Sequence, residues 1–193
     1  LLLARNRVGY QQLCELLTKA YLAEGRRDRA EIRREWFTEL GCDGLIALSG
    51  AHWGDVGDAL INGNFDLAGE RAKAWEAIFP GAFYLEVQRY GQPQQEAIVQ
   101  QTADLAGDLG LPLVATHPIQ FMNPDDFQAH EARVCIAEGY VLGDHRRPKI
   151  YTAEQYFKTQ EEMATLFADL PEALANTLEI AKRCNIEMTL GKN

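Results

Sequence analysis

Four side chains of this sequence have types and positions that acid–base or metal chemistry could use. Each lies within or directly after a short apolar run; they are His52, Glu86, His117 and Gln120. Histidine nitrogen and glutamate oxygen can bind a metal ion or carry a proton, whereas the neutral amide of Gln120 is a poor metal ligand and no base at neutral pH. The set leaves three alternatives open: a metal site, an acid–base histidine, or a pocket that has lost its chemistry.

Alternating strands and helices are expected to bring these side chains together. Buried strands are predicted over 44–50, 82–88 and 111–116. Helices are predicted between and around them over 9–23, 30–40, 55–62, 66–79 and 94–109. Strands joined by helical crossovers run parallel, and sites in such folds lie beyond their carboxyl ends. The ends of three strands should therefore converge on one pocket.

The region after Phe121 differs from the α/β part. Helices are predicted over 126–138, 159–167 and 170–184. Thr159 and Glu162 form a capping box, and Pro171 suits the first turn of the last helix. We therefore divide the chain into an α/β part, 1–122, and a mostly helical part, 123–193. Because residues 1–4 are typical of the end of a strand, we expect a piece of a longer protein.

Composition and charge narrow the classes of protein. The chain has 193 residues, 47% hydrophobic and 24% charged, which is ordinary for a globular domain. Its net charge of −9 argues against strong DNA binding by this piece alone, despite local basic groups such as His145-Arg146-Arg147. No apolar run is long enough to span a bilayer. The four cysteines are widely spaced, which favours reduced thiols in the cytosol over a disulfide framework.

Each candidate side chain also has a structural explanation. His52 could be a loop histidine packed on Trp53, and His117, directly before Pro118, could be a hydrogen-bonded structural residue. Glu86 would need partners if it pointed inward, since burying a lone carboxylate is costly, and it would need none if it pointed outward.

Several other motifs are absent or incomplete. His130-Glu131 lacks a second histidine at the spacing of a zinc protease helix, because position 134 is Val. Asp125 and Asp126 are better explained as helix caps than as catalytic acids. Phosphate-binding glycine loops and the nucleophile elbow do not occur.

Several stretches resemble the PHP (polymerase and histidinol phosphatase) domain of the bacterial replicative DNA polymerase III alpha subunit, and the resemblance extends from end to end. The stretches are Asn6–Leu13, Leu48–Gly50 with Gly54-Asp55, Tyr84–Gln88, Leu111–Thr116, Ala129–Cys135, Glu161–Met163, Leu166-Phe167, Leu170–Thr177 and Glu179–Asn185. The resemblance implies a PHP-type (β/α)7 distorted barrel with a helical C-terminal segment. The opening His-x-His strand of such domains is absent, so we expect a fragment that lacks the N-terminal strands.

The resemblance also implies that the pocket is depleted. Family members with an active metal site have Asn-Asp-x-His after the strand that corresponds to 113–116. Here Pro118 stands at the aspartate position and Gln120 at the histidine position. His52, Glu86, His117 and Gln120 are thus expected to be vestigial, with no catalytic residue, no cofactor and no bound metal.

The resemblance implies a role within a larger enzyme. The parent protein would be a DNA-directed DNA polymerase in DNA replication, a cytoplasmic nucleotidyltransferase that uses Mg²⁺ outside this chain. The PHP fragment would be non-catalytic, would support the rest of the alpha chain and would dock the proofreading exonuclease subunit, epsilon. It would meet DNA only through the full protein and would have no membrane partner.

An enzymatic function is the alternative. The pocket could be a metal-dependent phosphoesterase or pyrophosphatase, using Zn²⁺ or Mn²⁺. A free-standing PHP phosphatase is a third option, which the helical stretch 166–185 argues against, since that stretch matches the replicative family.

Overall fold

The structure is a computed structural model that describes residues 1–23, 30–188 and 191. Its strands are β1 (Leu2–Ala4), β2 (Leu45–Leu48), β3 (Phe83–Gln88) and β4 (Leu113–Thr116). Its helices are α1 (Arg7–Leu22), α2 (Glu35–Leu40), α3 (Asp55–Ile61), α4 (Phe65–Ile78), α5 (Gln95–Leu109), α6 (Phe127–Glu138), α7 (Gln160–Leu166) and α8 (Pro171–Arg183), with single turns η1 (Ala51–Trp53) and η2 (Pro124–Asp126).

The four strands form one sheet in the order β1-β2-β3-β4. The pairs β2–β3 and β3–β4 are parallel, as the helical crossovers predict, whereas β1 pairs antiparallel to β2. The register aligns Gln88 with Thr116 at the carboxyl ends of β3 and β4. In the described residues this is an open sheet, so the mixed α/β class is confirmed at this level.

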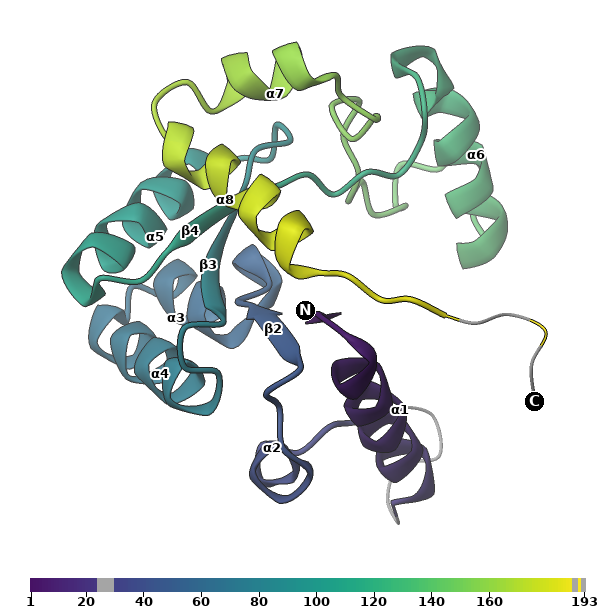
Figure 1. The fold of residues 1–193 in the computed structure, drawn as a ribbon. Coiled ribbons are helices and arrows are strands. Elements are labelled where there is room, and N and C mark those ends of the chain that lie inside the picture. Colours follow the sequence, from purple (N-terminus) through teal and green to yellow (C-terminus); the bar gives the residue numbers. More distant parts are fainter. Residues whose placement is uncertain (24–29, 189–190, 192–193) are drawn as a thin grey trace.

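Helices cover both faces of the sheet. Figure 1 shows α8 crossing in front of β3 and β4, while α3, α4 and α5 lie to the left of the strands. The interior between these layers is apolar, with Leu45, Leu85 and Val114 at most 1% exposed. Burial of such side chains supplies most of the driving force for folding and fixes the positions of the strand ends.

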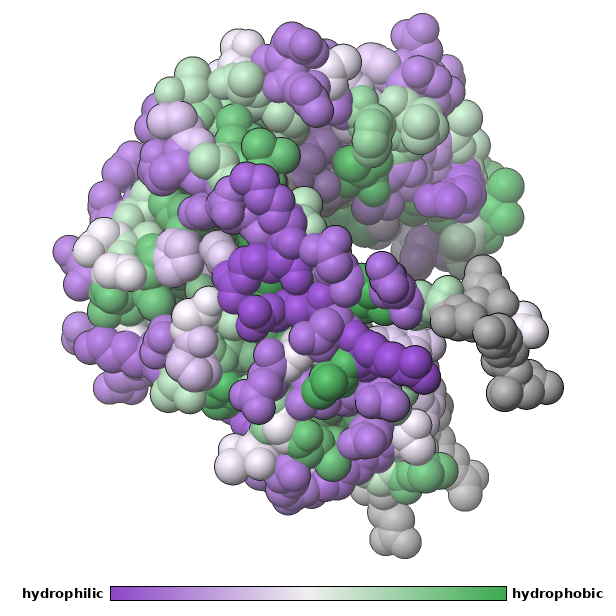
Figure 2. All heavy atoms as spheres, in the orientation of Figure 1, coloured by the Kyte–Doolittle hydropathy of each residue, from purple (hydrophilic) through white to green (hydrophobic). Residues whose placement is uncertain are grey.

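The C-terminal helices are joined to the sheet by polar contacts as well as by packing. Asn176 of α8 donates to the carbonyl oxygen of Leu113 at 2.7 Å. Arg89, just after β3, donates to the carbonyl oxygen of Leu166 at 2.7 Å and pairs with Asp169 at 2.6 Å. The outward face of α8 is hydrophilic, seen as the purple centre of Figure 2.

Most predicted elements are present with shifted ends. The capping box of Thr159 and Glu162 and the first-turn position of Pro171 are confirmed, as is the capping role of Asp126, whose carboxylate accepts from the Asn123 amide at 2.9 Å. The helix predicted over 30–40 was too long: only Glu35–Leu40 is helical. Its β-branched and charged start, 30–34, offers no N-cap, and Arg34 at the N-cap position makes no side-chain capping bond.

Within the described part of the chain, no helix is both long and apolar enough to cross a membrane.

Candidate functional site

The carboxylate of Glu86 connects the carboxyl ends of three strands. Its Oε2 accepts from the backbone amide of Gly50, after β2, at 3.0 Å. Its Oε1 accepts from Gln88 Nε2 at 3.2 Å and from the hydroxyl of Thr116 in β4. Glu86 is 5% exposed, so it faces inward with the partners that a buried carboxylate requires. The donors are all neutral, and they occupy both oxygens.

Neighbouring contacts complete this strand-end network, which we define as Ser49, Gly50, Glu86, Gln88 and Thr116. The hydroxyl oxygen of Ser49 accepts from the backbone amide of Glu86 at 2.9 Å, and Gln88 Nε2 donates to Thr116 Oγ1 at 2.9 Å. The amide oxygen of Gln88 is buried without a hydrogen-bond partner in the described residues.

The turn after β2 needs glycine for close packing. A Cβ at Gly54 would lie 1.7 Å from the carbonyl oxygen of Ser49, and one at Gly57 would lie 2.0 Å from that of Ala51. Helix α3 can therefore begin directly against the turn only because these positions have no side chain. This packing holds His52 beside the strand-end network.

His52 lies in this turn and contacts two aromatic rings. Its Nε2 is 2.8 Å from the hydroxyl of Tyr90, and its ring centroid is 4.6 Å from that of Trp53. Burial lowers the pKa of His52, and the Glu86 carboxylate opposes that shift. Burial also raises the pKa of the Tyr90 hydroxyl. The histidine is therefore neutral at pH 7, packed on Trp53 as its structural explanation predicts.

A cavity of about 350 Å³ lies beside His52 and Glu86. Residues of the turn after β2, of β3, of the loop 90–95 and of α5 line it, together with Lys149 and Ile150 from the C-terminal part. Gln92 Nε2 donates to the carbonyl oxygen of Ile150 at 2.9 Å and holds that wall in place.

His117 and Gln120 do not line this cavity. His117 Nε2 is 2.8 Å from the carbonyl oxygen of Glu154, and the backbone amide of Gln120 donates to Gln155 at 2.8 Å. Burial lowers the pKa of His117; the Glu154 carbonyl raises it and the Lys158 ammonium lowers it. The structure thus brings His52 and Glu86 together and joins the other two candidates to segment 154–158.

No group of three or more His, Cys, Asp or Glu side chains in the described residues is arranged to hold a metal ion. Glu86 could bind a metal only by giving up hydrogen bonds from the Gly50 amide, Gln88 or Thr116. The geometry is that of a hydrogen-bonded strand connection.

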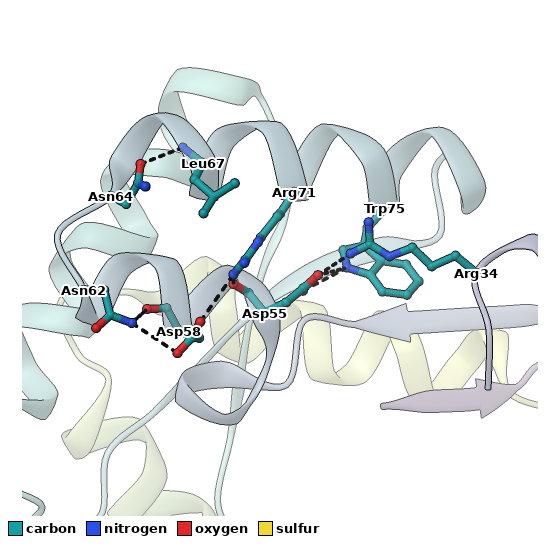
Figure 3. Close-up of polar contacts among 8 residues, drawn as sticks. All are labelled: Arg34, Asp55, Asp58, Asn62, Asn64, Leu67, Arg71 and Trp75. Carbon is teal, nitrogen blue, oxygen red and sulfur yellow. Dashed lines mark hydrogen bonds and ion pairs between the residues drawn. The ribbon is translucent and has the colours of Figure 1, made fainter. Parts of the chain in front are cut away.

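A second carboxylate, Asp55, lies at the start of α3 and is held by charged and aromatic partners (Figure 3). Its oxygens accept from Trp75 Nε1 at 2.9 and 3.2 Å and pair with Arg34, whose guanidinium lies 4.4 Å from the Trp75 ring. Arg71 of α4 donates to the Asp55 carbonyl oxygen and lies 3.4 Å from Asp58. These contacts fasten α2, α3 and α4 to one another.

His130 and Glu131 have structural contacts, in agreement with the absence of the second histidine that a zinc protease helix would need. Glu131 forms a buried ion pair with Arg147, and the His130 ring lies edge-on to Tyr151 at 4.7 Å. Burial, with the nearby Arg133 charge, lowers the pKa of His130.

The candidate residues named from the sequence did not include Gln88, Tyr90 and Thr116, which complete the site. Gln88 and Thr116 are the last residues of the second and third predicted strands. Because parallel neighbouring strands end at the same edge of the sheet, these two polar side chains could have been expected to lie side by side. Tyr90 follows the predicted strand 82–88 by two residues, which already placed it at the same edge of the sheet.

Comparison with known proteins finds a family model that matches part of the chain. Residues 1–90, which span β1 to the end of β3, match the PHP domain.

The whole chain is similar to part of DNA polymerase III subunit alpha. It is 55% identical over 195 residues to that protein from Neisseria meningitidis serogroup A, covering 100% of this chain and 17% of the relative. It is 48% identical to the Pseudomonas fluorescens protein, covering 100% and 16%, and 46% identical to the Escherichia coli CFT073 protein, covering 98% and 16%. The predicted resemblance is confirmed, and the chain spans about a sixth of these relatives' length.

The PHP match includes His52, Glu86 and Tyr90 but ends before His117 and Gln120. His52 and Glu86, which lie together in the fold, are thus inside the matched region. His117 and Gln120, which the fold places elsewhere, are outside it.

Proposed function

We propose that this chain is a non-catalytic PHP region of a replicative DNA polymerase III alpha subunit. In this role it supports the polymerase part of the same chain and docks the proofreading exonuclease subunit, epsilon. The complete protein would be a cytoplasmic DNA-directed DNA polymerase, with nucleotidyl transfer carried out by carboxylates and two metal ions elsewhere in the chain. In the complete domain the open sheet would be part of the (β/α)7 barrel of the family.

The observation that carries this proposal is the state of Glu86. A metal-dependent phosphoesterase needs carboxylate and imidazole ligands that are free to face the metal. The Glu86 oxygens are instead taken by neutral donors from three strands, and His52 Nε2 is taken by Tyr90. These contacts support a structural role for the site.

Exposed apolar side chains supply two candidate docking surfaces. One lies on α6 and the following loop, where Ile136 is 83% and Val141 70% exposed; the other lies on α1, where Tyr21 is 77% exposed. Figure 2 shows hydrophobic atoms, in green, over the α6 side of the molecule. Exposed apolar groups of this kind are typical of protein–protein contacts.

Docking can be tested by gel filtration of the full-length protein with purified epsilon. We expect co-elution, weakened by Ile136→Glu or by Tyr21→Glu according to which surface is used, with Glu70→Ala on exposed α4 as control. Separate elution of the wild-type proteins would contradict the docking role.

The absence of catalysis can be tested with p-nitrophenyl phosphate and pyrophosphate in the presence of Zn²⁺ or Mn²⁺. We expect equal background rates for the wild type and for His52→Ala. Hydrolysis that disappears in His52→Ala would establish the phosphoesterase alternative instead.

A further inference from the structure

The cavity beside His52 has the size and the wall chemistry of a small-molecule site. Its volume of about 350 Å³ lies within the range of ligand pockets, roughly 300–1,000 Å³. Apolar side chains, among them Ile61, Ile98 and Val99, form much of the wall. The cavity also lies where the α/β part meets residues 149–150 of the C-terminal part, and junctions of this kind often hold ligands.

One wall of the cavity is a row of aromatic rings. Trp53, His52 and Tyr90 follow one another, with centroids 4.6 Å apart for the first pair and 5.7 Å for the second. Trp53 is 80% exposed although tryptophan is on average well buried. A flat aromatic guest could stack on this row in the offset or tilted geometries that aromatic rings prefer.

The backbone around the cavity is strained. Ala51 has φ 47° and Gln94 has φ 64°, and these are the non-glycine residues with positive φ in the described part of the chain. Both line the cavity. Strain of this kind costs energy and gathers at ligand sites, where the surroundings enforce it. Gln88 also lines the cavity, and its buried amide oxygen has no hydrogen-bond partner in the described residues. This unpaired oxygen is a second feature that costs folding free energy at the cavity.

The charges of the wall favour neither sign of ion. It carries one carboxylate, Glu86, and one ammonium, Lys149, so it has no excess of either charge. Both Glu86 oxygens already accept hydrogen bonds, so the carboxylate has little left to offer a bound ion. An uncharged ligand needs no charged partner in the wall.

We propose that this cavity binds an uncharged, planar aromatic molecule, stacked against Trp53 and His52. The inference rests on the cavity itself and holds whether or not the chain docks epsilon.

The probe for this test is indole, which is flat, uncharged and small enough for the cavity. Saturation-transfer NMR with the full-length protein measures its binding, which we expect with a dissociation constant of about 1 mM, reasonable for so small a molecule. Inorganic pyrophosphate, added in a parallel titration, should leave the indole signal unchanged.

Two variants locate the binding. Trp53→Ala removes an exposed ring and should weaken indole binding about fivefold. Ile98→Trp fills the cavity from α5 and should abolish the binding at this site. Tyr21→Ala, which removes an aromatic ring of matching exposure from α1, is the control and should bind as the wild type does. Circular dichroism checks that each variant is folded.

Three outcomes would overturn the proposal. They are no indole binding by the wild type, equal binding by wild type and Trp53→Ala, and displacement of indole by pyrophosphate. The last outcome would identify an anion site. Trp53→Ala keeps the test decisive if Ile98→Trp does not fold.

Discussion

Glu86 and Asp55 both lie in stretches that resemble the PHP domain, yet their carboxylates have different surroundings. Glu86 is 5% exposed and is held by neutral donors from three strand ends. The Asp55 side chain is 34% exposed and is held by the Arg34 guanidinium and the Trp75 indole (Figure 3). A buried carboxylate that depends on neutral donors should be costly to remove and insensitive to salt, whereas a half-exposed ion pair should be cheaper and screened by salt.

Removing the buried carboxylate should have the largest effect. Glu86→Ala leaves three donors without their acceptor, and we expect it to lower the free energy of unfolding by about 3 kcal/mol, after partial hydration from the neighbouring cavity. Urea denaturation measures the change. Glu70→Ala, at an exposed position of α4, is the control and should stay within about 0.5 kcal/mol of the wild type. A Glu86→Ala protein as stable as that control would show that the strand-end network contributes nothing.

Removing the half-exposed carboxylate should have a smaller effect that depends on salt. Asp55→Ala should cost about 1 kcal/mol at low ionic strength, since an exposed ion pair and one hydrogen bond are lost. At about 1 M NaCl the cost should shrink, while the cost of Glu86→Ala should not. Asp66→Ala, in the first turn of α4, is the matched control. Equal salt dependence for Asp55→Ala and Glu86→Ala would remove the distinction between the two regions.

The smallest expected effect is a pH dependence from two partly buried histidines, His52 and His117. Burial lowers the pKa of His52 and His117 below the ordinary value of 6.5. The unfolded chain then binds protons that the folded chain does not, so stability is full above pH 6.5 and decreases as the pH falls below it. His52→Gln should flatten the decrease in urea midpoint between about pH 7 and pH 5.

The matched substitution for this comparison is His145→Gln, in an exposed loop. Equal loss of stability by His52→Gln and the wild type over that pH range would contradict a lowered pKa of His52 in the folded chain.

Local patterns predicted much of the fold. The strand–helix alternation, the Thr159 capping box and the position of Pro171 each depend on residues a few positions apart, and each is confirmed. The start of α2 was placed too early because helical spacing alone says little about where a helix without a capping side chain begins.

The site was predicted only in part because its contacts join distant segments. The partners of Glu86 depend on the register that sets Gln88 beside Thr116, and Tyr90 is 38 residues from His52. The contact of His117 with the Glu154 carbonyl likewise joins residues 37 positions apart. A sequence names the residue types at three strand ends, but tertiary contacts decide which of them share a cavity.

Metal content tests the central claim most directly, since the claim is that the strand ends form a hydrogen-bonded connection rather than a metal centre. The purified 193-residue chain would be exposed to Zn²⁺ and Mn²⁺, desalted and analysed for both elements, alongside His52→Ala and His117→Ala. We predict metal far below one ion per chain in all three proteins. One ion per chain in the wild type, lost in either histidine variant, would contradict the account and move the phosphoesterase function to first place.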